Sequence, residues 1–406
     1  MRLHLVPGRQ PPDLLELPWT IPLEQWDSPR LVRMARGTSR HVVRFVGDGE
    51  RVYALKEMEP DLTQHEYTAL RRMALERLPV VEAVGLVSGR ESAAGEPLDS
   101  VLVTRYLDFA LPYRYLFGVE GGAPLGRRLL DAAVVLLVRL HLDGWWWGDC
   151  SLNNLLFRRD AGALTAYLVD AETADHREAP LPDRLRETEL DLARENLVGG
   201  ILDLQAGGRA LYVDPVFAAD KLQERYDALW QELTGAEEAG EEDRHRIDQR
   251  IRRLNDLGFD VGEVVVEHDP RRRRLRLQPA LVEEGHSARE LRRLTGLEVQ
   301  ENQARRLLND IASFGAHLER TEGRLPPPAV VAGRWMVEVY ERFAESVPAE
   351  LRGRREVPEL FHELLEHRYF LSEAAGQQVD TWDAAADYLD GVLRARRDER
   401  VLAEDD

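Results

Sequence analysis

Asp149 and Asn154 lie five positions apart, between a long apolar segment and a short one. Asp170 follows a second short apolar run, residues 166–169. Carboxylate and amide oxygens are hard ligands that suit a hard cation such as Mg²⁺, and the ammonium group of Lys56 could bind phosphate. Phosphoryl transfer from a nucleotide requires these parts: a cation on the phosphates, oxygen ligands for the metal, and a carboxylate that orients the acceptor.

Lys56 stands out because lysine is so rare in this chain. Lys56 and Lys221 are the only lysines among 54 basic residues, and the other 52 are arginines, a pattern typical of high-GC coding bias. Lys56 ends the alternating segment 52–56, which is similar to the V-A-I-K pattern of kinases. A strand fixes the direction of its side chains, so the ammonium could point at α- and β-phosphates. The ordinary alternative is an exposed lysine at the end of a strand.

The helix predicted for residues 61–77 could supply an acid that holds Lys56 in place. Glu66 is our first candidate, and Glu59, just before this segment, and Glu76, within it, are rivals. The alternative is a solvated helix face.

Asp149 and Asn154 have the D-x-x-x-x-N spacing of a kinase catalytic loop. In that role Asp149 would orient the acceptor hydroxyl, Asn154 would bind Mg²⁺ through its amide oxygen, and Asp170 would be the second metal ligand, with Glu172 as a further helper. A polar loop and a turn aspartate are the ordinary alternatives.

A small polar turn, residues 36–40, precedes the first predicted hairpin strand. Backbone N–H groups of Gly37, Thr38 and Ser39 could form a nest for phosphate. One glycine is weak evidence, and an ordinary turn explains the segment equally well.

Residues 28–233 resemble the protein-kinase-like superfamily through this ordered set. Trp147-Gly148-Asp149 stands where protein kinases have His-Arg-Asp, and Asp170-Ala171-Glu172 stands where they have Asp-Phe-Gly. These two tripeptides look more like those of the small-molecule branch of the superfamily, such as aminoglycoside or choline phosphotransferases and lipopolysaccharide kinases. With the segment 371–376, the chain resembles a bacterial family that pairs a lipopolysaccharide-kinase-like domain with a C-terminal domain of unknown function.

The resemblance implies ATP and Mg²⁺ as cofactors, and a hinge at residues 104–108 in which the backbone around Tyr106 meets the adenine. It implies an acceptor that is a small molecule or of glycan or lipid type, and it names no substrate. We therefore expect an ATP-dependent phosphotransferase acting on a hydroxyl of a non-protein acceptor. A nucleotide-binding pseudokinase that serves as a scaffold or regulator is the main alternative, and a DNA-binding regulator is a weaker one.

The elements that must position these residues follow from hydrophobic periodicity and turn signals. Residues 42–46 and 51–55 are expected to form a hairpin around the turn 47–49. The other elements expected in this half are strands 80–87 and 100–107, a loop 88–99, helix 125–142, a loop 145–154, a hairpin 155–157 with 165–169, and helices 183–205 and 217–233.

The second half is predicted to be mostly helical. A linker is expected at 235–243, and the elements expected beyond it are a helix 244–257, a hairpin 261–267 with 274–278, two helices in 287–320 broken near Gly296, and helices 329–346, 357–366 and 381–397. The fold class is therefore α+β, a two-lobed kinase-like fold with a small antiparallel sheet lobe and a helical lobe, followed by a mostly helical domain. The expected parts are 1–27 (N-terminal extension), 28–107 (N-lobe), 108–234 (C-lobe) and 244–406 (C-terminal domain).

Composition excludes several other classes. The net charge of −19 over 406 residues opposes non-specific nucleic-acid binding. One cysteine, Cys150, excludes an intrachain disulfide and a multi-cysteine zinc site. The apolar run 129–140 contains Asp131 and Arg139 and is too short to span a bilayer, and no signal peptide is recognised, so we expect a cytoplasmic protein. The oligomeric state is not predicted.

Several conspicuous residues are better explained by structure. We expect Trp145, Trp146 and Trp147 to pack the catalytic loop onto the helical core, with an acceptor-binding wall as the alternative. We expect Cys150 to be a buried thiol. The arginine run 271–274 is expected to be a solvated turn, and Glu298 with Glu301 argues against a DNA-reading helix in 287–320 because both would repel phosphates.

Overall fold

The computed structural model of the chain consists of two compact units. The first contains residues 1–158 and 165–227, and the second contains residues 159–164 and 228–400. The structure describes residues 1–6, 13–34, 40–49, 51–118, 122–208, 213–234, 237–239, 249, 254, 261–269, 274–281 and 285–400.

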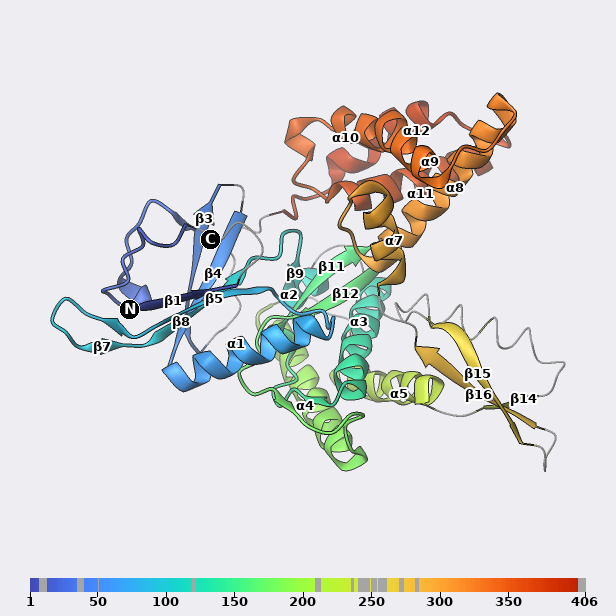
Figure 1. Ribbon diagram of the computed structural model, residues 1–406. Helices are drawn as coiled ribbons and strands as arrows, with labels where there is room; N and C mark the ends of the chain where they lie inside the picture. Colours follow the sequence, from blue (N-terminus) through green and yellow to red (C-terminus); the bar gives the residue numbers. More distant parts are fainter. Residues whose placement is uncertain are drawn as a thin grey trace. The chain divides into compact units, whose positions relative to one another are not determined.

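A six-stranded antiparallel sheet organises the start of the first unit (Figure 1). Its strands, in spatial order, are β1 (Arg2–Leu5), β5 (Ala83–Ser88), β8 (Ser100–Arg105), β4 (Arg51–Met58), β3 (Val42–Asp48) and β2 (Leu31–Val32). The predicted hairpin is confirmed as β3 and β4, which pair from Val42 opposite Glu57 to Asp48 opposite Arg51. Strand β4 continues to Met58, so Lys56 lies within the strand and not at its end.

The two faces of the sheet have different neighbours. Tyr53 and Leu55 of β4 face a core that also contains Trp19 and Trp26 from the N-terminal segment. Because side chains alternate along a strand, Ala54 and Lys56 point to the opposite face. Residues 13–26, within the expected N-terminal extension, therefore cover one face of the sheet and leave the other to the cavity described below.

Helix α1 (Pro60–Leu75) packs against β5 and β8. Pro60 begins the helix, a position where its missing N–H costs nothing. Its buried positions are Thr63, Glu66, Ala69, Leu70 and Met73, which follow a helical period. Glu66 is the charged member of this buried row. The helix ends two residues before the predicted boundary of 77.

The segment predicted as a loop between β5 and β8 contains a small ribbon, β6 (Arg90–Glu91) paired with β7 (Pro97–Leu98). Arg90 is 1% exposed and donates to the carbonyl oxygens of Trp19 (3.1 Å) and Ile21 (2.6 Å). Its guanidinium also bonds Glu57 of β4 at 2.5 Å. A buried arginine therefore ties the N-terminal segment to the sheet.

The rest of the first unit is mainly helical. Its helices are α2 (Tyr113–Gly118), α3 (Gly122–Leu142), α4 (Asp183–Ala206) and α5 (Pro215–Thr234), and the unit boundary falls within α5. The short strands here are β9 (Leu111–Pro112), β10 (Trp145–Trp146), β11 (Leu155–Asp160), β12 (Ala163–Leu168) and β13 (Asp175–His176). The predicted hairpin is confirmed as β11 and β12, with β9 on the other side of β11. Sequence reasoning missed α2, β9, β10 and β13.

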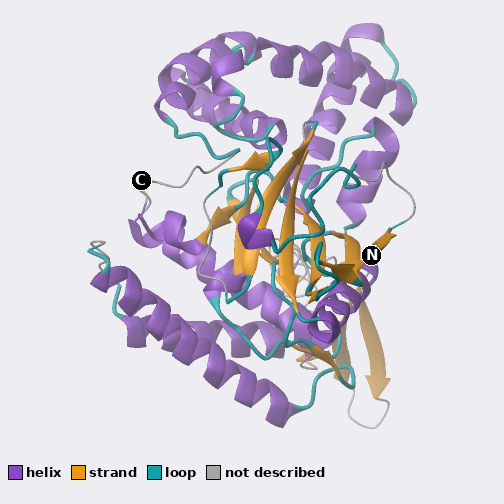
Figure 2. Ribbon diagram, turned by 90° about the vertical axis from the view of Figure 1, so that its left-hand side faces the viewer, coloured by secondary structure: helices purple, strands orange, loops and turns teal. Residues whose placement is uncertain are grey.

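The second unit, which we call the C-terminal unit, combines a three-stranded sheet with a helical core (Figure 2). The sheet contains β14 (Glu237–Ala239), β16 (Arg274–Leu281) and β15 (Val261–Asp269). The predicted hairpin of β15 and β16 is confirmed. Residues 237–239, expected to be linker, form a strand, while the predicted helix 244–257 lies almost entirely outside the described residues, of which it contains only 249 and 254.

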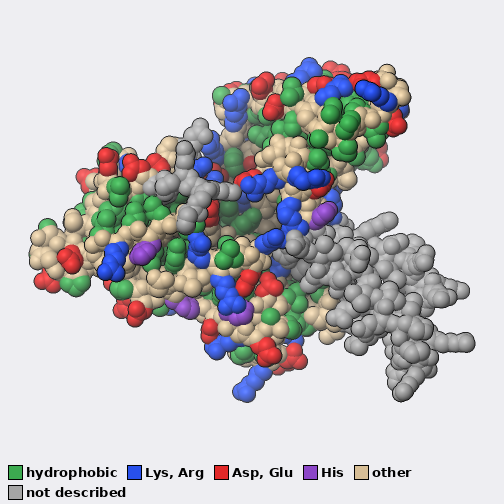
Figure 3. Space-filling model, in the orientation of Figure 1, with side chains coloured by type: hydrophobic (Ala, Val, Ile, Leu, Met, Phe, Trp, Pro, Cys, Tyr) green, Lys and Arg blue, Asp and Glu red, His purple; other side chains and the backbone are tan. Residues whose placement is uncertain are grey.

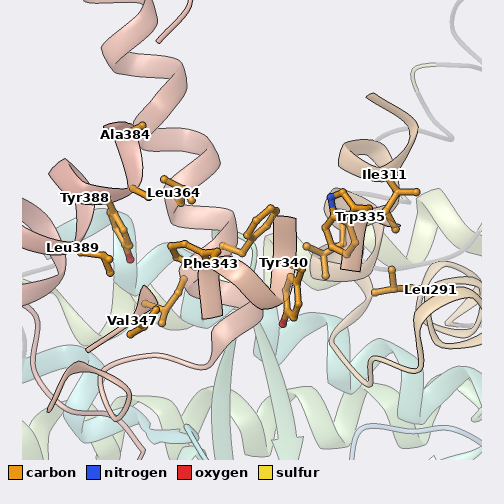
Figure 4. Packing of buried hydrophobic residues seen from close by; sticks show 14 of the residues in the cluster. Leu291, Ile311, Trp335, Tyr340, Phe343, Val347, Leu364, Ala384, Tyr388 and Leu389 are labelled. Atoms are coloured by element: carbon orange, nitrogen blue, oxygen red, sulfur yellow. The ribbon is translucent and has the colours of Figure 1, made fainter. Parts of the chain in front are cut away.

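The helices of this unit are α7 (His286–Thr295), α8 (Glu301–Glu322), α9 (Pro328–Trp335), α10 (Arg342–Ser346), α11 (Val357–Ala375) and α12 (Thr381–Asp387). The predicted break at Gly296 is confirmed, with φ +80°. A π-helical stretch, Met336–Glu341, joins α9 to α10. One apolar core joins these helices: residues of α8, α11 and α12 pack around Trp335, Tyr340 and Phe343 (Figure 4).

The α+β class expected from the sequence is confirmed: an antiparallel sheet with helix α1 packed on it, then a helical part and a mostly helical C-terminal unit. Acidic and basic side chains are interspersed on the visible surface of the described residues (Figure 3). Within the described part of the chain, no helix is long and apolar enough to cross a membrane.

Candidate active site

A cavity of about 590 Å³ lies in the first unit, beside β3, β4 and the loops that follow α3 and β12. Its volume is within the range of pockets that hold a cofactor or small molecule. Seven of the residues proposed from the sequence line it: Lys56, Glu66, Tyr106, Asp149, Asn154, Asp170 and Glu172. The other three, Gly37, Thr38 and Ser39, lie outside the described residues.

Lys56 is the centre of the polar wall of this cavity. Its Nζ donates to Glu66 Oε2 at 3.0 Å and to Asp170 Oδ2 at 2.8 Å, and Glu172 Oε2 lies 3.6 Å away. Its side chain is 12% exposed. Burial alone would lower the pKa of the ammonium, but the attraction of Glu66 and Asp170 outweighs burial and raises it. Lys56 is therefore held as a cation.

Glu66 is fully buried on α1. Burial, with a smaller contribution from Asp170, raises the pKa of its carboxyl group to about 7, although Lys56 opposes the shift. Its second oxygen accepts the backbone N–H of Ala171 at 3.3 Å. Glu66 thus connects Lys56 to the segment that carries Asp170.

The two rivals of Glu66 have other positions. Glu59 precedes α1 as its N-cap residue. Glu76 accepts hydrogen bonds from Arg72 at 2.9 Å and from the indole of Trp145 at 2.6 Å. Of the three acids, Glu66 is the one whose carboxylate bonds Lys56.

Asp149 and Asn154 share one loop turn. The amide nitrogen of Asn154 donates to the carbonyl oxygen of Asp149 at 3.4 Å, and its backbone N–H donates to Ser151 at 3.0 Å. Because the amide nitrogen is used in this way, the amide oxygen is the atom of Asn154 suited to a cation. The Asp149 carboxylate, with 36% of its side chain exposed, lies 3.5 Å from Arg40.

Gly148 gives this loop its conformation. Its φ of +81° is the left-handed region, and an added Cβ would lie 3.1 Å from the carbonyl oxygen of Thr173. Its N–H donates to Glu189 of α4 at 2.5 Å, and Glu189, fully buried, also bonds His141 at 2.8 Å. The glycine in Trp-Gly-Asp is therefore required by a close approach of backbone segments.

Asp170 lies two residues past β12, opposite the start of β11. The backbone N–H of Val169 donates to the carbonyl oxygen of Asn154 at 3.0 Å, which brings the residues before and after the hairpin together. The other oxygen of Asp170 accepts the N–H of Glu172 at 3.1 Å. Its side chain is 28% exposed, so the carboxylate is open to the cavity.

Trp147 joins this segment to the catalytic loop. Its indole donates to the carbonyl oxygen of Asp170 at 3.2 Å, and its own carbonyl accepts the hydroxyl of Thr173 at 2.7 Å. Trp145 and Trp147 are 2% and 3% exposed, which confirms the packing interpretation for both. Trp146 is half-buried.

Sequence reasoning missed three basic residues of the site. His41 Nε2 lies 2.7 Å from Glu172 Oε2, Arg40 pairs with Asp149, and Arg114 donates to the amide oxygen of Asn153 at 3.1 Å. All three line the cavity. No spacing rule links His41 to an acid 131 positions later, and the arginine-rich composition hides the other two.

Other conspicuous residues have structural positions. Cys150 is buried, and burial raises the pKa of its thiol well above the ordinary value. Glu301 accepts the backbone N–H groups of Ser287 and Ala288, both at 3.0 Å, and so caps helix α7. Of the arginine run, Arg274 lies in β16, while 271–273 are outside the described residues.

The donor set of the cavity suits a metal-bound nucleotide. Asn154 and Asp170 offer one amide and one carboxylate oxygen, and Mg²⁺ is commonly held by one or two carboxylates together with substrate phosphates and water. Among the described residues, no group of three or more His, Cys, Asp or Glu could hold a metal on its own. The other wall is apolar and includes Val43, Ala54, Leu102, Leu156 and Val169.

Residues 228–393 match a family described as "Domain of unknown function (DUF4032)". No curated protein sequence matches the chain. Among solved structures, "WaaP in complex with acyl carrier protein" is 17% identical with a TM-score of 0.35, and the match covers 55% of this chain and 88% of that one.

Two further similar structures are named as kinases. The BubR1 kinase domain is 13% identical (TM-score 0.30, 38% of this chain, 49% of that one), and the yeast RNA Pol II CTD kinase CTDK-1 complex is 14% identical (TM-score 0.28, 39% and 50%). The chain spans about half the length of these two. The first unit combines an antiparallel sheet, one helix packed on it and a helical part.

Proposed function

We propose that the chain is a Mg²⁺-dependent ATP phosphotransferase that acts on a hydroxyl group of a non-protein acceptor. One observation carries the proposal: Lys56 Nζ bonds Glu66 at 3.0 Å and Asp170 at 2.8 Å on the wall of a 590 Å³ cavity. A lysine buried among three carboxylates is costly to place unless its charge is used, because desolvation of each ion opposes folding.

Each wall of the cavity has a role in this proposal. The apolar side chains of Val43, Ala54 and Leu156 would enclose the base, beside the strand end that carries Tyr106. Lys56 would donate to phosphate oxygens, and Glu66 would hold its ammonium in place. Asn154 and Asp170 would hold Mg²⁺, which when bound would neutralise charge on the phosphates.

Asp149 would orient the acceptor. Its carboxylate is partly exposed and follows Gly148, whose backbone is fixed by Glu189. Arg40, the partner of Asp149, has a side chain that is 75% exposed, and exposed ion pairs contribute little stability. An acceptor hydroxyl can therefore replace Arg40 at the Asp149 carboxylate at small cost.

The finer assignment also belongs to this proposal. The Trp-Gly-Asp and Asp-Ala-Glu forms support the small-molecule, lipopolysaccharide-kinase-like branch, with an acceptor of small-molecule, glycan or lipid type. A cytoplasmic location is part of the same proposal. The division into an N-lobe (28–107), a C-lobe (108–234) and a C-terminal domain (244–406) is proposed on the same grounds. Phosphate binding by Gly37, Thr38 and Ser39 stays a prediction.

The test is ATP turnover with a panel of hydroxylated acceptors, measured for wild type, Asp149→Ala and Asp170→Ala. We expect turnover by wild type and background rates for both variants. Equal background rates in all three, in a protein that still binds ATP, would replace the enzyme with the pseudokinase alternative. The contact of Glu172 with both His41 and Lys56 favours that alternative, because these protein contacts occupy Glu172, which would otherwise assist the metal.

A further inference from the structure

The turn between β11 and β12 belongs to the C-terminal unit. Residues 159–164 form one compact body with residues 228–400, while the strands on either side of the turn continue into the first unit. The opposite end of the same hairpin carries Asn154 before β11 and Asp170 after β12. A six-residue strand spans about 20 Å, so the hairpin links the C-terminal unit to the proposed metal ligands by continuous chain.

Asp160, the last residue of β11, lies in this segment. It is 3% exposed and accepts the backbone N–H groups of Asn302 at 3.2 Å and Gln303 at 2.8 Å. Both donors belong to the first turn of α8, where N–H groups lack helical partners and favour a carboxylate. Asp160 therefore caps a 22-residue helix of the C-terminal unit.

Gln303 and Glu359 complete the contact. The amide nitrogen of Gln303, which is 1% exposed, lies 3.1 Å from the carbonyl oxygen of Arg159 and 3.0 Å from a carboxylate oxygen of Glu359. Glu359 also accepts the backbone N–H of Ala161 at 2.9 Å. Every residue of the turn from 159 to 161 is thus hydrogen-bonded to a buried group of α8 or α11.

An ion pair extends the contact toward the end of the described chain. The guanidinium of Arg159 bonds both oxygens of Glu399, each at 2.9 Å, and Arg355 bonds Glu399 at 2.7 Å. Two parallel bonds between arginine and carboxylate fix orientation as well as distance. We name Arg159, Asp160, Ala161, Gln303, Glu359 and Glu399 the hairpin clamp.

We propose that the hairpin clamp is a positioning device: through it the C-terminal unit sets the geometry of Asn154 and Asp170, and thereby metal binding. The proposal rests on the proposed function for the identity of the ligand. At the other end of the hairpin, the bond from Val169 N–H to the Asn154 carbonyl keeps the two ligand-bearing segments in register. Coupling between two sites is reciprocal, so metal and nucleotide should in turn stabilise the clamp.

The test compares two amide-to-alanine variants on the same helix of the full chain. Gln303→Ala removes a clamp residue, and Asn309→Ala changes an exposed residue of α8 as the control. Each protein is titrated with Mn²⁺ at saturating ATP, followed by electron paramagnetic resonance, and with ATP in the absence of divalent metal. We expect Gln303→Ala to weaken Mn²⁺ binding about 5- to 10-fold and to leave metal-free ATP binding within about twofold.

Asn309→Ala should match wild type in both titrations. Unchanged Mn²⁺ affinity in folded Gln303→Ala would overturn the proposal, and so would an equal loss in both titrations, which marks general loosening. Asp160→Asn retains an acceptor oxygen for one of the two N–H groups, so its loss of Mn²⁺ affinity should lie between those of Asn309→Ala and Gln303→Ala. It replaces Gln303→Ala in the test if that variant does not fold.

Hydrogen exchange without any ligand separates this inference from the proposed function. If wild type binds neither ATP nor Mn²⁺–ATP, the proposed function fails, yet the clamp can still be tested. Exchange across residues 154–170 should be faster in Gln303→Ala than in Asn309→Ala. Identical exchange in the two variants would overturn the clamp as a positioning device.

Discussion

The cavity around Lys56 and the hairpin clamp both contain buried polar groups, but the hydrogen-bond and ion-pair partners of those groups differ. In the cavity, Lys56 faces Glu66, Asp170 and Glu172, so formal charges satisfy one another and Asp170 keeps 28% of its side chain exposed. In the hairpin clamp, Asp160 and Glu359 are bonded mainly by backbone N–H groups and the neutral amide of Gln303.

Both clusters raise the pKa of a carboxyl group by burial, to about 7 for Glu66 and about 7 for Glu359. The difference lies in the net charge that remains. One lysine among three acids leaves a site that still attracts cations, whereas in the clamp the carboxylates of Asp160 and Glu359 accept hydrogen bonds from N–H dipoles. The two kinds of cluster, the structural one in the clamp and the ligand-binding one in the cavity, therefore differ in the groups that their carboxylates bond. Substitutions in each cluster test this distinction.

Asp170→Asn should have the largest effect. It removes the charge of a proposed metal ligand while keeping the shape, so we expect turnover to fall about a thousandfold or more. The free energy of unfolding should change by less than about 1 kcal/mol, because the excess negative charge near Lys56 decreases. Steady-state kinetics and urea unfolding measure both, with the exposed Asp203→Asn as control. A large loss of stability with normal turnover would place Asp170 with the structural carboxylates.

Lys56→Arg should follow, with about a hundredfold loss of turnover. The planar guanidinium keeps the charge but is a poor substitute for a compact ammonium between Glu66 and Asp170. Lys221→Arg is the matched control, since Lys221 lies on α5 in a surface pair with Glu224 and should tolerate the change. Equal activities of the two variants would show that position 56 needs only a positive charge.

Glu359→Gln tests the clamp through pH. Burial raises the pKa of this carboxyl from 4.5 to about 7, so the folded protein keeps a proton that the unfolded chain releases. Its stabilising contribution is present below about pH 4.5 and is lost as pH rises to about 7, on the order of 3 kcal/mol in total. The variant should therefore show a shallower fall of unfolding free energy between pH 5 and 7 than wild type or the exposed Glu373→Gln. An unchanged slope would refute a neutral Glu359.

Gly148→Ala should cost about 1–3 kcal/mol of stability and reduce turnover, because a Cβ at φ +81° would meet the backbone of Thr173. Gly199 of α4 has open space around its Cβ position, so Gly199→Ala is the control and should be neutral or slightly stabilising. Thermal unfolding of both variants measures the difference, and equal melting temperatures would contradict the close approach.

Cys150→Ala should have the smallest effect. The thiol is buried and its pKa is raised, so it is no nucleophile, and we expect turnover within about twofold of wild type. A modest stability loss of about 1 kcal/mol should accompany it. Inactivation of this variant without unfolding would give the cysteine a chemical role beside Asp149.

Local signals predicted much of the fold. Alternation predicted β3 and β4, the helical spacing of residues 61–77 predicted the start of α1 to within one residue, and Gly296 predicted the break between α7 and α8. Pairings between distant segments could not be predicted. Nothing in residues 2–5 indicates β5 as their partner. The helix predicted for 357–366 ends too early, because Tyr369 and Phe370 are apolar but exposed and so do not continue the buried period of α11 to Ala375.

The candidate site shows the same limit. The order of Lys56, Glu66, Asp149, Asn154 and Asp170 was readable because each belongs to a short local pattern, and the structure places all five on one cavity. Their roles stay predictions. His41 and the hairpin clamp were not readable, because contacts such as Asp160 with Gln303 join residues 143 positions apart.

The most direct test of the central claim is a crystal structure of the full chain with Mg²⁺ and a non-hydrolysable ATP analogue. We expect Lys56 Nζ within hydrogen-bond distance of a phosphate oxygen, and Asn154 Oδ1 and Asp170 on the metal at about 2.0–2.1 Å. A nucleotide bound elsewhere, or a Lys56 that still bonds only Glu66 and Asp170 while the phosphates lie away from it, would contradict the claim.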